Sequence, residues 1–254
     1  MSMNIYNITF SPTGGTQRVG DRLCQSLGAN CVATDLCVSE GCLIAPCIGA
    51  DDLAVISMPV YAGRVPAVAV HRLREIKSHG ARCVIVAVYG NRAYDDALVE
   101  MLDVATELGY RVIAAIGAVA EHSIVRKYGA GRPDADDARD LAQFAETIAR
   151  KLASGSDSVP EVPGNRPYKT PKACPQPSAH GSCKECGLCA KQCPVGAISV
   201  DNPKRVDKDK CISCMRCVKV CPTHSRGIGK IVAAMVTQLL KKGCAMRKPN
   251  ELFI

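Results

Sequence analysis

Apolar and polar positions alternate in a regular order along the first 153 residues of the chain. Short apolar runs rich in β-branched residues are typical of buried strands, and the amphipathic stretches between them are typical of helices. The pattern predicts strands at residues 4–10, 31–36, 53–58, 83–88 and 111–119, and helices at residues 16–27, 66–79, 94–108 and 133–152. Because strands alternate with helices, the sequence predicts an α/β fold with a doubly wound parallel sheet.

The character of the chain changes after residue 153, where the first predicted domain (residues 1–153) ends. Residues 154–179 contain six prolines, which indicates an extended linker rather than a helix or a strand. Residues 180–226 form a small cysteine-rich unit. Residues 227–254 are predicted to form a closing helix, which ends at residue 242 before Gly243, and a tail. The apolar face of this helix is expected to pack within the protein rather than on a membrane.

Cysteine content and the lack of a long apolar run narrow the class of protein. The 254-residue chain has 16 cysteines, and no apolar run reaches the roughly 18 residues of a membrane-spanning helix. The first residues lack the basic and apolar regions of a signal peptide, so we expect a cytoplasmic protein with no membrane partner. Cytosolic thiols stay reduced, which favours metal ligation over disulfides for closely spaced cysteines.

Eight of the cysteines form two copies of one motif. Each copy has the pattern Cys-x-x-Cys-x-x-Cys-x-x-x-Cys-Pro, and the second copy follows the first by 28 residues. Three cysteines on one tight loop can reach three irons of one cube, whereas the fourth lies just past that loop. The pattern is that of two-cluster bacterial ferredoxins, in which the fourth cysteine ligates the other cluster.

This resemblance implies two [4Fe–4S] clusters with crossed ligands, and hence a small two-cluster ferredoxin domain. The first cluster is assigned Cys183, Cys186, Cys189 and Cys221, and the second is assigned Cys211, Cys214, Cys217 and Cys193. Two structural zinc sites are the alternative. Zinc sites do not call for a third cysteine at the same spacing and a following Cys-Pro, twice over.

A loop rich in hydroxyls and glycines connects the first predicted strand to the first predicted helix. It contains Ser11, Thr13, Gly14, Gly15 and Thr16. The free amides and positive dipole of a helix N-terminus can bind a phosphate, which glycine lets the backbone approach. The loop resembles the phosphate loop of flavodoxins, and because it contains no Lys or Arg it points to the monophosphate of FMN. An ordinary Ser/Thr helix cap is the alternative.

Two further loops follow predicted strands, at the edge of the sheet where doubly wound folds bind ligands. They resemble the loops that border the flavin ring in flavodoxin-like proteins. The first provides Pro59, Val60, Tyr61, Ala62 and Gly63, and the second provides Tyr89, Gly90, Asn91, Arg92 and Tyr94. The three tyrosines are candidates for aromatic contact with the ring. The alternative is that each is a half-buried surface side chain.

Two other features each have two interpretations. Residues 121–133 are too polar for a simple turn and are expected to cover the flavin or to face the clusters. Within them, His122 is either a proton donor or, as is more common, a loop histidine whose hydrogen bonds are satisfied. Cys37, Cys42 and Cys47 recur every five residues and form either a third metal site or simply a cysteine-rich loop.

The order of the motifs resembles the fused flavodoxin–ferredoxin proteins of anaerobes, the EFR1-type ferredoxin family. The resemblance spans nearly the whole chain and implies FMN and two clusters in one polypeptide. The leading hypothesis is an electron-transfer protein that relays electrons between FMN and external one-electron redox partners through the clusters. The alternative is an FMN-dependent reductase of a small substrate, fed by its own ferredoxin domain, with Arg64, Arg92 and His122 facing the substrate. A redox sensor or assembly factor is a third class.

The formal charge of +8 does not by itself indicate a nucleic-acid partner. The count treats cysteines as neutral, whereas two cubes with their thiolates would add about −4. A flavin phosphate would add about −2, which brings the loaded protein near neutrality. The chain also has no Trp and only three Phe residues to interleave with basic side chains. We therefore expect no nucleic-acid partner.

Overall fold

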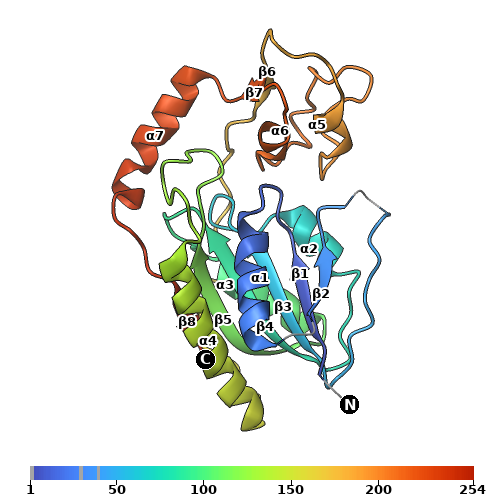
Figure 1. The fold of residues 1–254 in the computed structure, drawn as a ribbon, viewed down its shortest axis with the longest axis vertical. Helices are drawn as coiled ribbons and strands as arrows, with labels where there is room; N and C mark the ends of the chain where they lie inside the picture. Colours follow the sequence, from blue (N-terminus) through green and yellow to red (C-terminus); the bar gives the residue numbers. More distant parts are fainter. Residues whose placement is uncertain (1–2, 29–30, 39–40) are drawn as a thin grey trace.

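A computed structural model describes residues 3–28, 31–38 and 41–254, and its main body is a six-stranded sheet (Figure 1). The strands are β1 (Ile5–Thr9), β2 (Cys31–Asp35), β3 (Leu53–Pro59), β4 (Arg82–Tyr89), β5 (Arg111–Val119) and β8 (Glu251–Phe253). Their order is β2-β1-β3-β4-β5-β8, and β1 to β5 pair in parallel. The order 2-1-3-4-5 is that of flavodoxin. The predicted flavodoxin-like, doubly wound parallel sheet is therefore confirmed.

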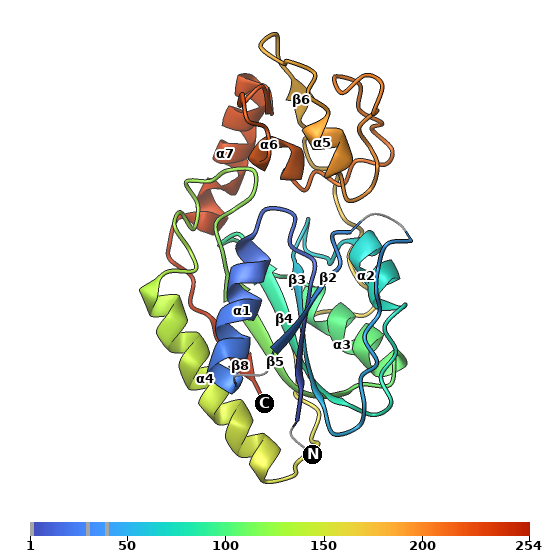
Figure 2. The same ribbon diagram turned by 45° about the vertical axis from the view of Figure 1, so that its right-hand side comes forward.

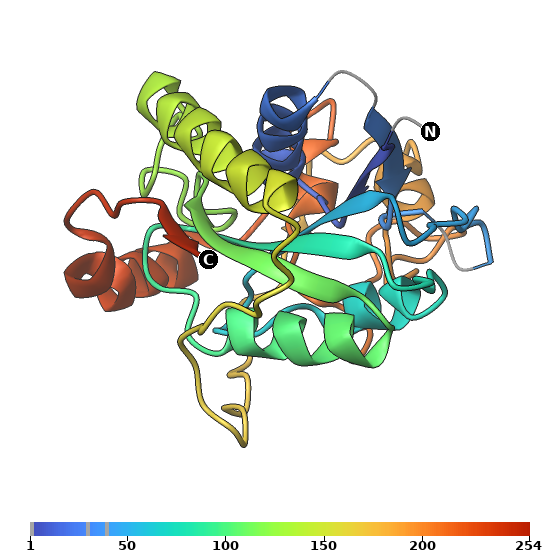
Figure 3. The same cartoon turned by 90° about the horizontal axis from the view of Figure 1, so that it is seen from below.

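Helices cover both faces of this sheet (Figure 3). The helices α1 (Gly15–Leu27) and α4 (Ala135–Ala153) lie on one face, and α2 (Ala67–Leu73) and α3 (Ala97–Glu107) lie on the other. All seven residues of β3 are buried, because a strand in the middle of such a sheet has a helix layer on each side. This double burial explains why the strands appear in the sequence as continuous apolar runs.

Two helices are shorter than the sequence predicts. We expected α3 from residue 94, but Asp95 has a left-handed φ of 45°, so the helix begins only at Ala97. We expected α2 to continue to residue 79, but it ends at Leu73. There the amide of Ile76 donates to the carbonyl of Leu73, three residues back, which tightens the last turn and stops the helix.

The cysteine-rich unit lies beyond the carboxyl ends of the parallel strands (Figures 1 and 2). It contains the short helices α5 (Leu188–Lys191) and α6 (Arg216–Lys219). Its two-stranded antiparallel sheet pairs β6 (Ser178–Ala179) with β7 (Arg226–Gly227). The unit therefore occupies the edge at which doubly wound folds bind their ligands.

The proline-rich segment before this unit follows the outside of α3. Asp96 accepts hydrogen bonds from the backbone amides of Asn165, at 3.0 Å, and Lys169, at 2.7 Å. Arg166 pairs with Asp103 on the same helix. These contacts give the extended linker a fixed course along the sheet domain.

The helix α7 (Lys230–Cys244) corrects two expectations. Gly243 lies inside the helix and does not end it. Val236 and Leu240 pack against Val125 and Tyr128, whereas most of the expected apolar face points to solvent. The exposed fractions are 79% for Ile231, 67% for Met235 and 82% for Leu239. The helix has a second apolar stripe, and that stripe is the one that packs, half-buried, against the sheet domain. No helix within the described ranges is long and apolar enough to cross a membrane.

The tail after α7 returns to the sheet, which the sequence does not predict. Glu251–Phe253 forms β8, antiparallel to β5. Before it, Asn250 is buried: its Oδ1 accepts from the amide of Val119 at 2.9 Å, and its Nδ2 donates to Asp137 at 2.9 Å and Asp140 at 2.8 Å. The tail thus belongs structurally to the sheet domain.

Replacing Asn250 with alanine should destabilise the protein by about 1–3 kcal/mol, because the change leaves the buried amide of Val119 without an acceptor and removes one donor from the buried carboxylate of Asp137. The measurement is the urea unfolding midpoint of the loaded protein. Met246→Ala, which removes an exposed side chain of the same tail, serves as the control and should leave the midpoint unchanged. Equal midpoints for the two variants would contradict an anchoring role for Asn250.

Candidate functional site

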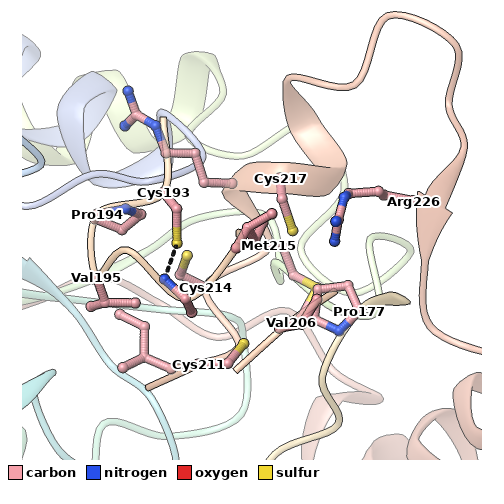
Figure 4. Close-up of a pocket in the computed structure, with 14 residues that line it drawn as sticks. Pro177, Cys193, Pro194, Val195, Val206, Cys211, Cys214, Met215, Cys217 and Arg226 are labelled. Carbon is pink, nitrogen blue, oxygen red and sulfur yellow. Dashed lines mark hydrogen bonds between the residues drawn. The ribbon is translucent and has the colours of Figure 1, made fainter. Parts of the chain in front are cut away.

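Four cysteine thiols line one cavity in the C-terminal unit (Figure 4). They belong to Cys193, Cys211, Cys214 and Cys217. Cys193 comes from the first copy of the motif and the other three come from the second copy. The structure therefore brings together the set that the crossed assignment gives to the second cluster, although ligation itself stays a prediction.

The rest of the cavity wall combines apolar side chains with two arginines, Arg216 and Arg226. Among the residues that the structure describes, Nε of Arg216 and both Nε and Nη1 of Arg226 have no hydrogen-bond acceptor. Buried thiols beside unpaired cationic donors fit an anionic iron–sulfur cube. The sequence interpretation missed both arginines. The signal was present, because the 28-residue repeat places them where the first copy has Leu188 and Ile198.

The two copies of the motif have the same backbone geometry. The amide of Ala197 donates to Sγ of Cys193 at 3.3 Å, and the amide of Ser225 donates to Sγ of Cys221 at 3.3 Å. Each fourth cysteine thus receives a hydrogen bond from the residue four positions further on. The repeated hydrogen bond shows that the chain takes the same course after the fourth cysteine of each copy.

The first cysteine set is closer to solvent. Cys186 is exposed, Cys183 and Cys221 are half-buried, and only Cys189 is buried. At Cys221, burial opposes ionisation, but hydrogen bonds from Thr223 and from backbone amides outweigh it and hold the pKa of the thiol below its usual value. A cluster at this set would be the one that an external protein can approach.

The thiols of the second set are harder to ionise. Burial raises the pKa of Cys214 to about 12 and that of Cys217 to about 11. The Arg226 guanidinium acts in the opposite direction at Cys217. Negative charge at this set therefore depends on positive groups close by.

Arg72 of α2 connects the unit to the edge of the sheet. Its guanidinium is 5% exposed and donates to the carbonyl of Leu36 at 2.7 Å and to that of Pro194 at 2.5 Å. Pro194 directly follows Cys193, and Leu36 lies just after β2. One buried side chain thus fixes the second cysteine set against the sheet domain.

Cys37 lies between the predicted phosphate loop and this set. Its Sγ accepts a hydrogen bond from the amide of Ser11 at 3.1 Å. Burial and Asp35 raise the pKa of Cys37 to about 12, and the nearby Arg216 opposes them. The other two cysteines of the series, Cys42 and Cys47, are exposed. Cys37 therefore differs from both of them in its surroundings.

Tyr61 occupies the same junction from the neighbouring loop. Burial raises its pKa well above the usual value, and the thiols of Cys214, Cys37 and Cys174 act in the same direction. Of the three predicted ring tyrosines, Tyr61 is thus the one whose pKa is influenced by a thiol of the second cysteine set. The edge of the sheet and the cysteine-rich unit meet at this side chain.

The predicted phosphate loop leads directly into α1, which begins at Gly15 after Gly14 in the left-handed conformation, φ 87°. The hydroxyl of Ser11 accepts a hydrogen bond from the amide of Gln17 at 2.8 Å and so satisfies one amide of the first turn, whose N-cap residue is Gly14. The first amides of the helix, at Gly15 and Thr16, have no acceptor within it. They remain suited to a phosphate.

The first ring loop is a tight turn. Val60 directly follows Pro59, the last residue of β3, and its backbone amide donates to the carbonyl of Val88 at 2.9 Å. Tyr61 and Arg64 then exchange backbone hydrogen bonds of 2.8 and 3.1 Å. Between them both Ala62, φ 51°, and Gly63, φ 86°, are left-handed, as in the tight turns of β-hairpins. A Cβ on Gly63 would come within 2.4 Å of Asp95, so only glycine fits there.

The second ring loop holds the C-terminal tail. The hydroxyl of Tyr94 donates to Glu251 at 2.9 Å, and its ring lies edge-on to Tyr89 with centroids 5.3 Å apart. Asn91 donates to the carbonyls of Cys244 at 3.1 Å and Met246 at 2.9 Å. Arg92, next to Gly90 and Asn91, pairs with Asp95. These residues have a structural role that the sequence did not show, and their contact with a flavin stays a prediction.

One ring nitrogen of His122 forms hydrogen bonds within its own loop. Nδ1 accepts hydrogen bonds from the backbone amides of Ile124 and Val125, both at 3.1 Å. Burial and the Arg92 guanidinium lower the pKa of His122 to about 4, so it is neutral at pH 7. Of the two interpretations, these contacts fit a satisfied loop histidine rather than a proton donor.

Comparison with known proteins identifies one part of the chain. A family model described as a 4Fe-4S dicluster domain matches residues 182–225. The C-terminal unit is a ferredoxin-type 4Fe–4S domain. The match favours iron–sulfur clusters over structural zinc for the cysteine motif. A search of curated proteins found no match.

The sheet domain is similar to solved structures at low sequence identity. A Streptococcus pneumoniae TIGR4 flavodoxin is 17% identical and covers 59% of this chain and 99% of its own, with a TM-score of 0.40. A WrbA-like flavodoxin from Agrobacterium tumefaciens is 13% identical over 61% of this chain and 100% of its own, TM-score 0.40. A rubredoxin oxygen:oxidoreductase from Desulfovibrio gigas is 12% identical and covers 59% of this chain and 36% of its own, with a TM-score of 0.42. The fold assignment rests on the strand order described above.

The crossed ligand assignment can be tested by pairs of cysteine-to-alanine changes. Cys193→Ala with Cys217→Ala removes two ligands of one cluster, so about four irons per chain should remain. Cys193→Ala with Cys189→Ala removes one ligand from each cluster, so both clusters should be damaged. The measurement is iron and sulfide per chain after anaerobic purification. The reverse pattern would show that each motif copy holds its own cluster, and Cys174→Ala is the control.

Proposed function

We propose that this chain is an electron-transfer iron–sulfur flavoprotein that relays electrons between FMN and external one-electron redox proteins through two [4Fe–4S] clusters. The observation that carries the proposal is the position of the second cysteine set. It faces the carboxyl edge of a flavodoxin-like sheet, where Cys37 accepts the amide hydrogen bond of Ser11 and Tyr61 lies near both Cys37 and Cys214. Two redox groups in these sites would be neighbours within one polypeptide.

The residues present fit both groups. The four thiols around the cavity would hold the second cluster, with cationic donors beside it, and the more exposed set would hold the first. FMN would place its phosphate at the start of α1 and its ring beside the turn at Tyr61. Arg18 also lies close to this loop, since its Nη1 is 3.8 Å from the position of a Cβ on Gly14.

A flavin and an iron–sulfur cluster at these two sites could exchange single electrons. A flavin accepts one or two electrons and an iron–sulfur cluster passes one at a time. The protein holds the two sites at a fixed separation through Arg72, the linker along α3 and the tail that forms β8. Covalent connection also gives the sites a high effective concentration toward each other.

The alternative function, an FMN-dependent reductase of a small substrate, would need groups that face the substrate. Arg64 is bound to Glu100 by hydrogen bonds of 2.6 and 2.8 Å. Arg92 pairs with Asp95, and His122 is neutral and engaged in its loop. All three candidates have partners within the protein, which favours the electron carrier. A turnover assay with small quinones and nitro compounds separates the two functions.

The resemblance to fused flavodoxin–ferredoxin proteins supports the same proposal, as does the 4Fe–4S family match at residues 182–225. We include in the proposal a cytoplasmic location and redox proteins as the partners, without nucleic acid or membrane. The exposed first cysteine set is the expected docking point for such a partner.

The central experiment measures electron flow in anaerobically purified protein, which should contain about eight irons, eight sulfides and one FMN per chain. After rapid mixing with a one-electron donor, the flavin should be reduced through the clusters. Arg72→Met removes the contact to Pro194 and should slow flavin reduction by at least about tenfold through misplacement of the second cluster.

Arg74→Met is the matched control for this experiment, because Arg74 follows α2 closely but is exposed and pairs only with Glu107. It should leave the rate unchanged. Protein without flavin, or flavin reduced equally fast in both variants at full iron content, would contradict the proposed route.

The phosphate loop provides a separate prediction. Thr13→Ala with Thr16→Ala should weaken FMN binding by about 1–3 kcal/mol, because hydrogen bonds to a charged phosphate are lost. FAD, which lacks a terminal phosphate, should bind the unchanged protein much more weakly than FMN. Flavin fluorescence titrations measure both affinities. Thr106→Ala on α3 is the control, and an unchanged FMN affinity in the double variant would place the phosphate elsewhere.

A further inference from the structure

Arg226 has more hydrogen-bonding capacity than its surroundings use. Its side chain is 4% exposed and lines the cavity of the second cysteine set. Nη2 donates to the carbonyl of Pro203, whereas Nε and Nη1 have no acceptor among the residues that the structure describes. A buried cation with unpaired donors is costly unless a negative partner is present. The thiol-lined cavity is the place where such a partner would lie.

The residue contacts both cysteine sets. Its backbone lies next to the first set, because the amide of the preceding residue, Ser225, donates to Sγ of Cys221. Its side chain faces the second set, as Figure 4 shows. The positive charge therefore acts on the second set, while the main chain belongs to the loop of the first.

The internal repeat shows that this charge is specific to one half of the unit. Arg226 stands 28 residues after Ile198, and Arg216 stands 28 residues after Leu188. The first copy thus has apolar side chains at both positions where the second copy has arginine. Since the backbones of the two copies match, these arginines distinguish two sites that are otherwise alike.

We propose that Arg226 raises the reduction potential of the second cluster above that of the first, so that electrons entering at the exposed set collect beside the sheet. Reduction adds one negative charge to a cluster, and a fixed cation at low dielectric stabilises that charge. Donor groups near the sulfurs shift the potential in the same direction. In each transfer the first cluster loses one electron and the second gains it, with no proton or ligand moving.

This inference rests on the proposed function and adds the direction of electron flow between the two clusters. The test is an anaerobic potentiometric titration of the loaded full-length protein, with the reduced clusters followed by electron paramagnetic resonance. The unchanged protein should show two separate one-electron steps. Cys217→Ser alters a ligand of the second cluster and thereby identifies its signal.

Arg226→Gln should lower the reduction potential of the second cluster. The difference between the two reduction potentials, here called the gap, should therefore become smaller. The expected effect is a tenfold or larger fall in the second cluster's ratio of reduced to oxidised form at a fixed potential, which corresponds to 59 mV for one electron. Arg226→Lys, which keeps the charge but loses the planar fork, should give an intermediate gap. Arg205→Gln removes an exposed charge from the same unit and is the control.

An unchanged gap in Arg226→Gln at full iron content overturns the inference. If Arg226 served only to hold Pro203, the variant would lose stability or iron while its loaded molecules kept the wild-type gap, which also overturns it. Should Arg226→Gln fail to bind the second cluster, the titration of the unchanged protein decides: a second-cluster potential equal to or below that of the first refutes the proposal. Normal flavin reduction with an unchanged gap would leave the proposed function intact, whereas protein without flavin or clusters would overturn that function itself.

Discussion

Negative charge in a protein interior needs positive charge beside it, and this constraint governs the region where the two halves of the molecule meet. Four thiols line one cavity, and burial raises the pKa of three of them, Cys211, Cys214 and Cys217. Arg216 and Arg226 line that cavity, while Arg72 fixes the adjoining backbone to the sheet. Arginines thus serve both purposes at this junction: Arg72 holds the ferredoxin-type unit on the sheet domain, and Arg216 and Arg226 supply positive charge at its inner site.

The ferredoxin-type unit is held from both sides rather than attached at one end. Before it, the linker follows α3 through contacts at Asp96 and Asp103. After it, α7 packs on residues 124–128 and the tail enters the sheet as β8. Asn91 of the sheet domain donates to the tail, and Asn250 of the tail donates to Asp137, which also forms a buried ion pair with Arg132. The unit is thus an insertion into the sheet domain, placed before its last strand.

Much of this structure is predictable from local pattern, and the remainder depends on partners far away in sequence. Strands such as β3 are visible because burial on both faces requires continuous apolar residues. The cysteine sets are visible because cluster ligands need fixed spacing. By contrast, β8 has three residues and no pattern of its own, and Tyr94 finds its partner in Glu251, 157 residues away. Arg226 resembles any other basic residue until the two motif copies are compared.

The place of β8 in the chain has a consequence for how the protein is made. The free edge of β5 can be covered only after the ribosome has synthesised the cysteine-rich segment, α7 and the tail. Until then the nascent sheet presents an unpaired, largely apolar edge strand, the kind of surface that promotes aggregation. Closing the sheet is thereby linked to folding of the metal-binding unit. For a unit whose folding requires bound metal, loss of the metal would therefore also delay the covering of β5.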